Sequence, residues 1–361
     1  MLRPAAILLT FTEVSAQCLC SSLQVNQEDS EKIETQERPY ARSDFDNRTR
    51  FDKIAFRERR RLPEPAVDKG GFCMVMTAPM PTRPLGKTGW QASVLTLGGV
   101  KWDTQLPAGD AVALIQRALE LGVNNFDTAH MYGDGESERR LGQALRGAAQ
   151  PVFVSTKITD RTRDGARRQM DTSLQRLGMD RVDLMFVHGL DDEDDYRKVI
   201  GPDSVLHAIE EFRTAGRIRF VGVSGHWYRQ NMERILAEYP FDVVLCPLGL
   251  FNLAYGYSFV DTVLPLTRQR GMAVMGMKIF GAGRVKHAAS IEPYLRYSLN
   301  LPVDSLVIGC DSISQLEQTV RVVKSQPPPL SATEQAGFFP ECRRVTQSWD
   351  AGEFAWVSHY R

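Results

Sequence analysis

Three ionisable side chains each stand at the end of a short apolar run in this 361-residue sequence. Lys157 follows Asp127 by 30 residues, and His188 follows Lys157 by 31 residues. If the runs are neighbouring parallel strands, about 4.8 Å apart, then a carboxylate, an ammonium group and an imidazole converge at one mouth of the sheet. Tyr132, five residues after Asp127, falls on the loop that leaves the first run, within reach of the same point.

These four groups suit the reduction of a carbonyl, in which a hydride arrives at carbon and the oxygen needs a proton. A free tyrosine has a pKa of about 10 and is a weak acid at pH 7. Lys157 beside Tyr132 is expected to stabilise the phenolate and lower that pKa, while Asp127 keeps Lys157 charged and oriented. His188 is expected to hydrogen-bond the substrate oxygen. No metal and no protein nucleophile is needed.

Each residue alone also has a structural interpretation. A strand-end aspartate or lysine in a barrel is commonly half of an ion pair, and a single buried histidine is more often a core residue than a catalyst. The combination is what indicates catalysis. A second mechanism uses Lys157 as a nucleophile that forms a Schiff base, as in barrel aldolases, and that mechanism does not require Tyr132.

Short apolar runs alternate with stretches of helical period along most of the chain. The predicted strands are 94–98, 124–128, 152–156, 182–187, 218–223, 242–246, 273–277 and 305–308. The predicted helices lie near 108–121, 137–146, 162–178, 203–215, 228–238, 259–270, 293–299 and 312–324. Strict alternation favours a parallel sheet, because each right-handed crossover returns the chain to start a neighbouring parallel strand.

Eight such units over about 230 residues match the size of a closed (β/α)8 TIM barrel, an α/β fold. The alternative architecture is an open doubly wound sheet, which typically carries G-x-G-x-x-G after its first strand. The sequence LGGV at 97–100 lacks that spacing. The pattern therefore predicts the barrel.

We expect three parts along the chain. Residues 1–80 form a disordered or non-native N-terminal extension, since charge dominates from 24 to 70. An alternative interpretation of the first residues is a secretory signal. Residues 81–325 form the barrel, preceded by a β-hairpin around 83–90, and residues 326–361 form a C-terminal helix and tail packed on the barrel.

The composition excludes several classes of function. Lys plus Arg and Asp plus Glu are both 44, so no net charge attracts nucleic acid or an anionic membrane. No apolar run approaches the roughly 20 residues of a membrane-spanning helix. The six cysteines lack zinc or iron–sulfur spacing and are expected to be reduced thiols. We therefore expect a cytoplasmic protein that acts on a small molecule; its oligomeric state is not readable from the sequence.

The motifs around the four residues resemble those of the aldo/keto reductase family. They are DTAHMYG at 127–133, STK at 155–157 and VH at 187–188, followed in family order by 217–224, 276–283 and 308–309. The similarity extends from about 83 to 324. It implies an NAD(P)H-dependent oxidoreductase that reduces an aldehyde or ketone to an alcohol, or catalyses the reverse, with Tyr132 as proton donor.

The resemblance also implies an extended NADP(H) or NAD(H) across the barrel mouth, without a Rossmann domain. The residues that it assigns to the nicotinamide end are Gly99, Val100, Ser224 and Gly225. Those assigned to the pyrophosphate are Lys278, Phe280 and Gly281, and those assigned to the adenosine are Gly309, Ser312 and Gln315. A helix N-terminus near Ser312 would offer unpaired N–H groups to a phosphate.

Some positions depart from the family pattern. Asp311 stands where many NADP-preferring members have a basic residue, and its carboxylate would repel a 2′-phosphate, so NAD remains an option. Met277 replaces an aromatic that stacks on the nicotinamide. Some family members bind the cofactor as redox sensors or regulatory subunits with little turnover, which is the competing function. Trp102, Met131, Trp227 and Tyr228 follow strands and either line the pocket or pack the loops.

Overall fold

The computed structural model describes residues 78–226, 229–254, 259–283 and 290–347, all of which belong to the unit Pro65–Arg361. The predicted N-terminal extension up to residue 77 and the predicted tail from 348 onward lie outside the described residues.

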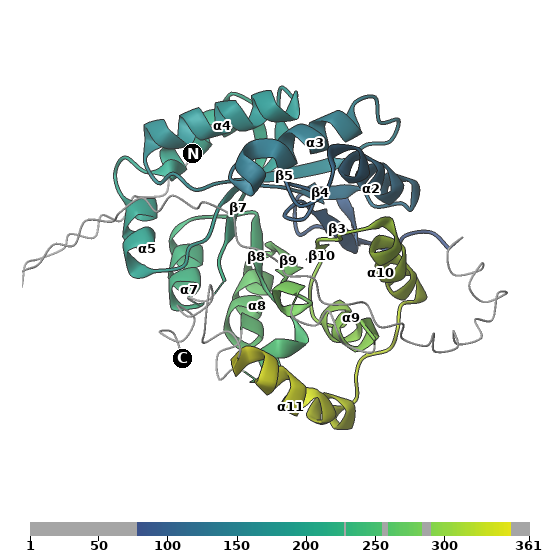
Figure 1. Ribbon diagram of the computed structural model, residues 1–361. Helices are drawn as coiled ribbons and strands as arrows, with labels where there is room; N and C mark the ends of the chain where they lie inside the picture. The colour runs from purple at the N-terminus through teal and green to yellow at the C-terminus, as the bar shows by residue number, and fades with distance from the viewer. Residues whose placement is uncertain (1–77, 227–228, 255–258, 284–289, 348–361) are drawn as a thin grey trace, which may run out of the picture. The chain divides into compact units, whose positions relative to one another are not determined.

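Eight parallel strands close into a barrel in the order β10-β3-β4-β5-β6-β7-β8-β9, as the interior of Figure 1 shows. They are β3 (Leu95–Gly98), β4 (Asn125–Asp127), β5 (Phe153–Ile158), β6 (Val182–Val187), β7 (Ile218–Ser224), β8 (Val243–Pro247), β9 (Ala273–Met277) and β10 (Ser305–Ile308). Closure comes from β10, where Leu306 pairs with Leu95 on one side and with Gly276 on the other. The predicted barrel is confirmed, and every predicted strand is present.

Helices follow the strands and surround the barrel (Figure 1). They are α2 (Ala108–Glu120), α3 (Glu136–Leu145), α4 (Arg163–Leu177), α5 (Glu193–Ile200), α6 (Val205–Thr214), α7 (Arg229–Glu238), α8 (Phe259–Arg270), α9 (Glu292–Leu299), α10 (Ile313–Ser325) and α11 (Ala332–Gln347). Short 3-10 turns are η1 (Tyr132–Gly135), η2 (Leu250–Ala254) and η3 (Gly281–Gly283). Helix α5 was not predicted from the sequence, because at 8 residues it is too short to show a sustained helical period; Asp192 caps it by accepting from the Asp195 N–H.

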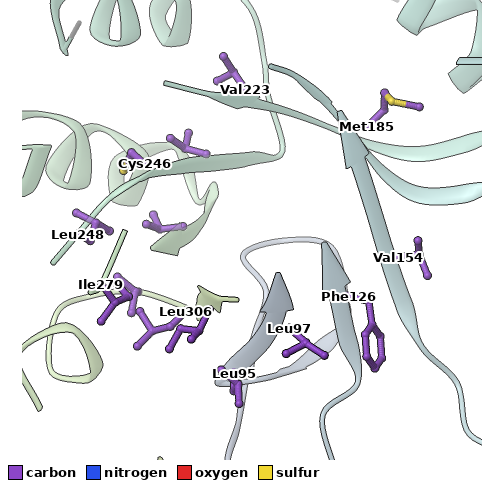
Figure 2. Packing of buried hydrophobic residues seen from close by; sticks show 14 of the residues in the cluster. Leu95, Leu97, Phe126, Val154, Met185, Val223, Cys246, Leu248, Ile279 and Leu306 are labelled. Atoms are coloured by element: carbon purple, nitrogen blue, oxygen red, sulfur yellow. The ribbon is translucent and has the colours of Figure 1, made fainter. Parts of the chain in front are cut away.

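The strands alternate their side chains between two separate cores, as a pleat of period two requires. One set packs outward against the helices; Figure 2 labels Leu97, Phe126, Val154 and Met185 of this set on β3 to β6. The other set fills the barrel interior and includes Phe153, Leu184, Phe186, Val243, Leu245 and Met275. A one-residue shift in any strand would exchange the two sets, so the register also decides which polar side chains face inward.

A β-hairpin packs against the starts of the barrel strands. It consists of β1 (Thr82–Pro84) and β2 (Gln91–Ser93), which pair antiparallel. Leu85 belongs to the interior core, and the Trp90 ring lies 5.8 Å from that of Phe153. The Trp90 indole N–H also donates to Asn125 at 2.7 Å. The hairpin therefore seals the end of the interior opposite the predicted site.

Helix α11 packs beside η2 and α9. The Tyr294 hydroxyl on α9 donates to Glu341 at 2.7 Å, and the Cys342 thiol donates to the Leu250 carbonyl at 3.7 Å. The Phe338 ring centroid lies 6.4 Å from that of Tyr294. These contacts attach the last described helix to the barrel. Within the described residues, no helix is both long enough and apolar enough to span a membrane.

The hairpin turn offers a test of this packing, because two of its glycines have left-handed backbones but different surroundings. A Cβ on Gly86, at φ +50°, would lie 2.5 Å from the backbone nitrogen of Ala273, whereas one on Gly89, at φ +77°, would meet nothing within 4 Å. We expect Gly89→Ala to cost about 1–2 kcal/mol through backbone strain alone. Gly86→Ala should cost roughly 2–5 kcal/mol, because overpacking against β9 adds to the strain. Urea unfolding measures both; equal losses would contradict the close approach of the turn to β9.

Candidate active site

The pleat of β4 and β5 turns two of the predicted residues into the barrel mouth. Asp127 follows the inward-facing Asn125 by two positions, and Lys157 follows Phe153 and Ser155 in the same way. The register pairs Asp127 with Ser155 across the two strands. Both charged residues therefore lie on the inner side of neighbouring strands, and both are only 2% exposed.

Asp127 and Lys157 form a buried ion pair. The Lys157 amine donates to Asp127 Oδ2 and, at 2.7 Å, to the carbonyl of Thr128, while the Ser155 hydroxyl donates to Asp127 Oδ1 at 2.7 Å. Burial by itself lowers the pKa of Lys157, yet the charge of Asp127, together with Tyr132, raises it above its ordinary value. Lys157 therefore stays charged, because its partners compensate the loss of water.

Tyr132 begins η1 and places its ring beside this pair. The Lys157 Nζ lies 4.9 Å from the centre of the Tyr132 ring, and the ring meets that of His188 edge to face at 5.9 Å. Burial raises the pKa of the Tyr132 phenol above its ordinary value, while the charge of Lys157 and a hydrogen bond from it act to lower it. The expected effect of Lys157 on the pKa of Tyr132 is therefore present, but the loss of water outweighs it and the pKa is raised. The phenol stays protonated at neutral pH, as a proton donor must.

His188 follows β6 and is kept neutral by its surroundings. Burial holds its pKa well below the ordinary range, and the positive charges of Lys157 and Arg161 lower it further. The His188 Nδ1 is buried and has no hydrogen-bond partner among the described residues. A neutral imidazole has one N–H donor and one acceptor nitrogen, so His188 can hydrogen-bond an oxygen in the site without placing a second positive charge beside Lys157.

A cavity of about 660 Å³ opens above these four residues, which all line it. Its size lies within the range of about 300–1,000 Å³ typical of small-molecule sites. Among the ten residues assigned to a cofactor, those that also line it are Gly99, Val100, Ser224, Lys278, Phe280, Gly309 and Gln315. The cavity thus runs from β4 to β6 across the mouth to the loops after β9 and β10.

Gly225, Gly281 and Ser312 do not line the cavity. Gly225 donates its backbone N–H to Leu245, and a Cβ there would lie 2.8 Å from Met232. Gly281 packs in the same way against Phe251. The Ser312 side chain caps the start of α10 by accepting from the Gln315 N–H, and it does not line the cavity.

The loops and helix α10 also bring residues into the cavity that the sequence did not single out. They include Lys101, Gln105, His226, Ile291, Gln318 and Thr319. Lys101 pairs with Asp311 at 3.4 Å, which joins the loops after β3 and β10. Position just after a strand was the signal that could have found Lys101 and His226.

The remaining residues predicted either to line the pocket or to pack the loops are three aromatic residues and a methionine. Trp102 is fully buried in the outer core, and Met131 is 57% exposed; neither lines the cavity. Trp227 and Tyr228 lie outside the described residues. No cluster of histidine, cysteine and acidic side chains suited to a metal occurs in the part of the chain that the structure describes.

A closed barrel with ionisable groups at the carboxyl ends of its strands is the architecture of a barrel enzyme. A model of the aldo/keto reductase family matches residues 94–298, more than half of the chain. The chain belongs to this family and is an oxidoreductase of the aldo/keto reductase type.

Two relatives and one solved structure illustrate the similarity. L-galactose dehydrogenase of Arabidopsis thaliana is 26% identical over 282 residues, which cover 67% of this chain and 87% of the relative. Pyridoxal 4-dehydrogenase of Microbacterium luteolum is 29% identical over 251 residues, covering 56% and 71%. An aldo-keto reductase of Bacillus halodurans, solved in its holo form, shares the fold with a TM-score of 0.59 at 23% identity, over 74% of this chain and 96% of that one.

The environment of His188 predicts a pH dependence of stability. Because the pKa of His188 in the folded protein lies below its ordinary value of 6.5, protonation favours the unfolded chain. The contribution of neutral His188 is complete above pH 6.5 and is lost as the pH falls below that value. We expect His188→Gln to flatten the decline in unfolding free energy between about pH 7.5 and 5, by up to about 1.4 kcal/mol per pH unit.

Urea unfolding at several pH values checks this expectation. His207→Gln, which changes an exposed histidine on α6, serves as the matched control and should leave the wild-type slope intact. Identical slopes for His188→Gln and the wild type would show that His188 is not held neutral in the folded protein.

Proposed function

We propose that this chain is a nicotinamide-dependent oxidoreductase that reduces an aldehyde or ketone to an alcohol, or catalyses the reverse oxidation. The observation that carries the proposal is the contact of Lys157 with both Asp127 and Tyr132 at the wall of the cavity. The proposed catalytic domain is residues 81–325, because all four catalytic candidates and the whole cavity lining lie within it.

Tyr132 is the proposed general acid. Its phenol holds a proton at neutral pH, and Lys157 stabilises the negative charge that develops when this proton moves to the substrate oxygen. Asp127 keeps the amine charged and fixes its position. His188, beside the Tyr132 ring, orients the carbonyl through a hydrogen bond. In alcohol oxidation the same groups accept the proton.

The cavity suits an extended dinucleotide, either NADP(H) or NAD(H), whose nicotinamide supplies or accepts the hydride when bound. Glycines keep the mouth open: a Cβ on Gly98 would lie 3.0 Å from Val307, and one on Gly309 would lie 3.0 Å from Lys101. Lys278 on the rim provides positive charge for a pyrophosphate. At the far end of the cavity Asp311 pairs with Lys101, so this end carries both a negative and a positive charge. Both NADP(H) and NAD(H) therefore belong in the test.

The Schiff-base mechanism receives less support. A lysine must be neutral to attack a carbonyl, so nucleophilic lysines have a lowered pKa. The pKa of Lys157 is raised, and its amine is held by Asp127 and the Thr128 carbonyl. This environment favours a lysine that acts through its charge.

Replacing the proposed proton donor tests the function. We expect Tyr132→Phe to bind NADPH or NADH as the wild type does, because the change removes one oxygen, but to lose at least about 10²-fold in turnover. Nicotinamide fluorescence measures binding, and absorbance of the reduced cofactor measures turnover with a panel of aldehydes and ketones. Since two relatives are dehydrogenases of L-galactose and pyridoxal, both compounds belong in the panel with each oxidised cofactor.

Tyr239→Phe is the matched control, because the Tyr239 hydroxyl bonds to Glu210 and does not line the cavity. Full turnover in Tyr132→Phe would assign the proton to another group. Cofactor binding without turnover of any substrate in the wild type would favour the alternative of a redox sensor or regulatory subunit.

A further inference from the structure

The loop that carries Tyr132 has an unusual backbone conformation that requires support from its surroundings. Three consecutive residues after Tyr132 have left-handed φ values: Gly133 at 55°, Asp134 at 51° and Gly135 at 85°. Aspartate tolerates this region better than most residues with a side chain, but it still costs more there than glycine, so the surroundings must help to hold the turn. The position of the phenol therefore depends on contacts made to this turn.

Arg176, in the last turn of α4, makes those contacts. Its Nη1 donates to the His130 carbonyl at 2.9 Å, and its Nη2 lies 3.7 Å from Asp134. The guanidinium lies against Gly135, where a Cβ would be only 2.3 Å from the Arg176 Cζ. The Arg176 side chain is 13% exposed, so its contact with the His130 carbonyl is largely shielded from water, whereas the Asp134 side chain is fully exposed. Arg176 thus touches the loop on both sides of Tyr132.

Glu138, on α3, connects Arg176 to the strand that carries Lys157. Its carboxylate is fully buried, lies 3.5 Å from Arg176 Nη1 and accepts the Thr156 hydroxyl at 2.7 Å. Thr156 is the neighbour of Lys157 on β5, and successive strand residues face opposite sides. Glu138 therefore contacts the outer side of β5 at Thr156, directly beside Lys157, whose side chain faces the cavity.

The free-energy cost of burying the Glu138–Arg176 pair argues that the pair does more than stabilise the fold. Removing two charges from water costs several kcal/mol per ion before their attraction compensates, and apolar replacements of buried ion pairs are often as stable. The Glu138–Arg176 pair is instead placed where it ties the tyrosine loop to the lysine strand. The His130 N–H adds a third link by donating to the Lys157 carbonyl at 3.0 Å.

We infer that the Glu138–Arg176 pair consists of positioning residues that set the geometry between the Tyr132 phenol and the Lys157 amine. Neither side chain lines the cavity, so the pair acts through the two residues that do. The inference rests on the proposed function. A proton donor and the cation that stabilises its charge must keep their distance closely, because a displacement of about 1 Å can cost about 10²-fold in rate.

Arg176→Ala tests the inference. We expect kcat to fall about 10²-fold while the Kd for NADPH or NADH changes less than about twofold, because the pair lies outside the cavity. The alkaline limb of the pH profile of kcat should move to higher pH. The reason is that Lys157 lowers the pKa of Tyr132, and this effect weakens as the two groups move apart. Of the three groups that face the phenol, Lys157, Asp127 and His188, only Lys157 lowers this pKa.

Two further measurements separate positioning from general stability. Arg167→Ala breaks a more exposed contact from the same helix, the 2.6 Å bond to Glu211 on α6, and should change neither kcat nor the pH limb. Guanidinium at low millimolar concentration, with sodium chloride at equal ionic strength as its control, should restore part of the lost kcat in Arg176→Ala. Glu138→Gln, which keeps the shape and removes the charge, should show the same loss in kcat and the same pH movement as Arg176→Ala.

If Arg176→Ala does not fold, Arg176→Lys carries the test, because lysine keeps the charge but not the second donor of the fork. A fall in kcat with a shifted pH limb, at an unchanged melting temperature, supports positioning. Wild-type kcat and pH limb in a folded Arg176 variant would overturn it, provided that Tyr132→Phe has lost turnover. Turnover retained in Tyr132→Phe would instead overturn the proposed function.

Discussion

The ion pair between Asp127 and Lys157 is the interaction on which the rest of the site depends. An ammonium group that is 2% exposed persists only beside a carboxylate and with its other hydrogens bonded, which Thr128 partly provides. Once held there, the charge works in two directions: it stabilises a developing phenolate on Tyr132 and it disfavours a second cation on His188. The charge of Lys157 thus favours the negative form of Tyr132 and the neutral form of His188.

The barrel makes this pair possible by keeping two cores apart. Outward side chains such as Phe126 and Val154 pack under the helices, so the inward side chains are free to change from apolar to polar along each strand. On β5 this change runs from Phe153 through Ser155 to Lys157. The hairpin covers the apolar end of the interior with Leu85 and Trp90, and the cavity opens at the other end, where Asp127 and Lys157 lie. The apolar residues that stabilise the barrel interior and the polar residues of the site thus lie at different ends of the same strands.

The phenol illustrates how opposing effects combine. The sequence suggests a lowered pKa for Tyr132 because it places a lysine nearby, and the structure supplies that lysine. The ring, however, also loses water, and this raises the pKa by more than the lysine lowers it. The result suits a donor, since the proton stays on the phenol until a stronger base develops on the substrate oxygen. Only the balance of burial and charge decides the sign, and burial is a property of the folded chain.

The sequence by itself determined the barrel, its eight strands and the meeting of Asp127, Lys157 and His188, because short apolar runs and the residues at their ends are local properties that a parallel sheet brings together. It missed α5, which is only 8 residues long, and it could not distinguish Gln315, which lines the cavity, from Ser312, which caps a helix. Contacts such as Thr156 with Glu138 also required the tertiary structure. Which side chains of neighbouring helices and loops meet depends on how those elements pack, and no local pattern encodes that.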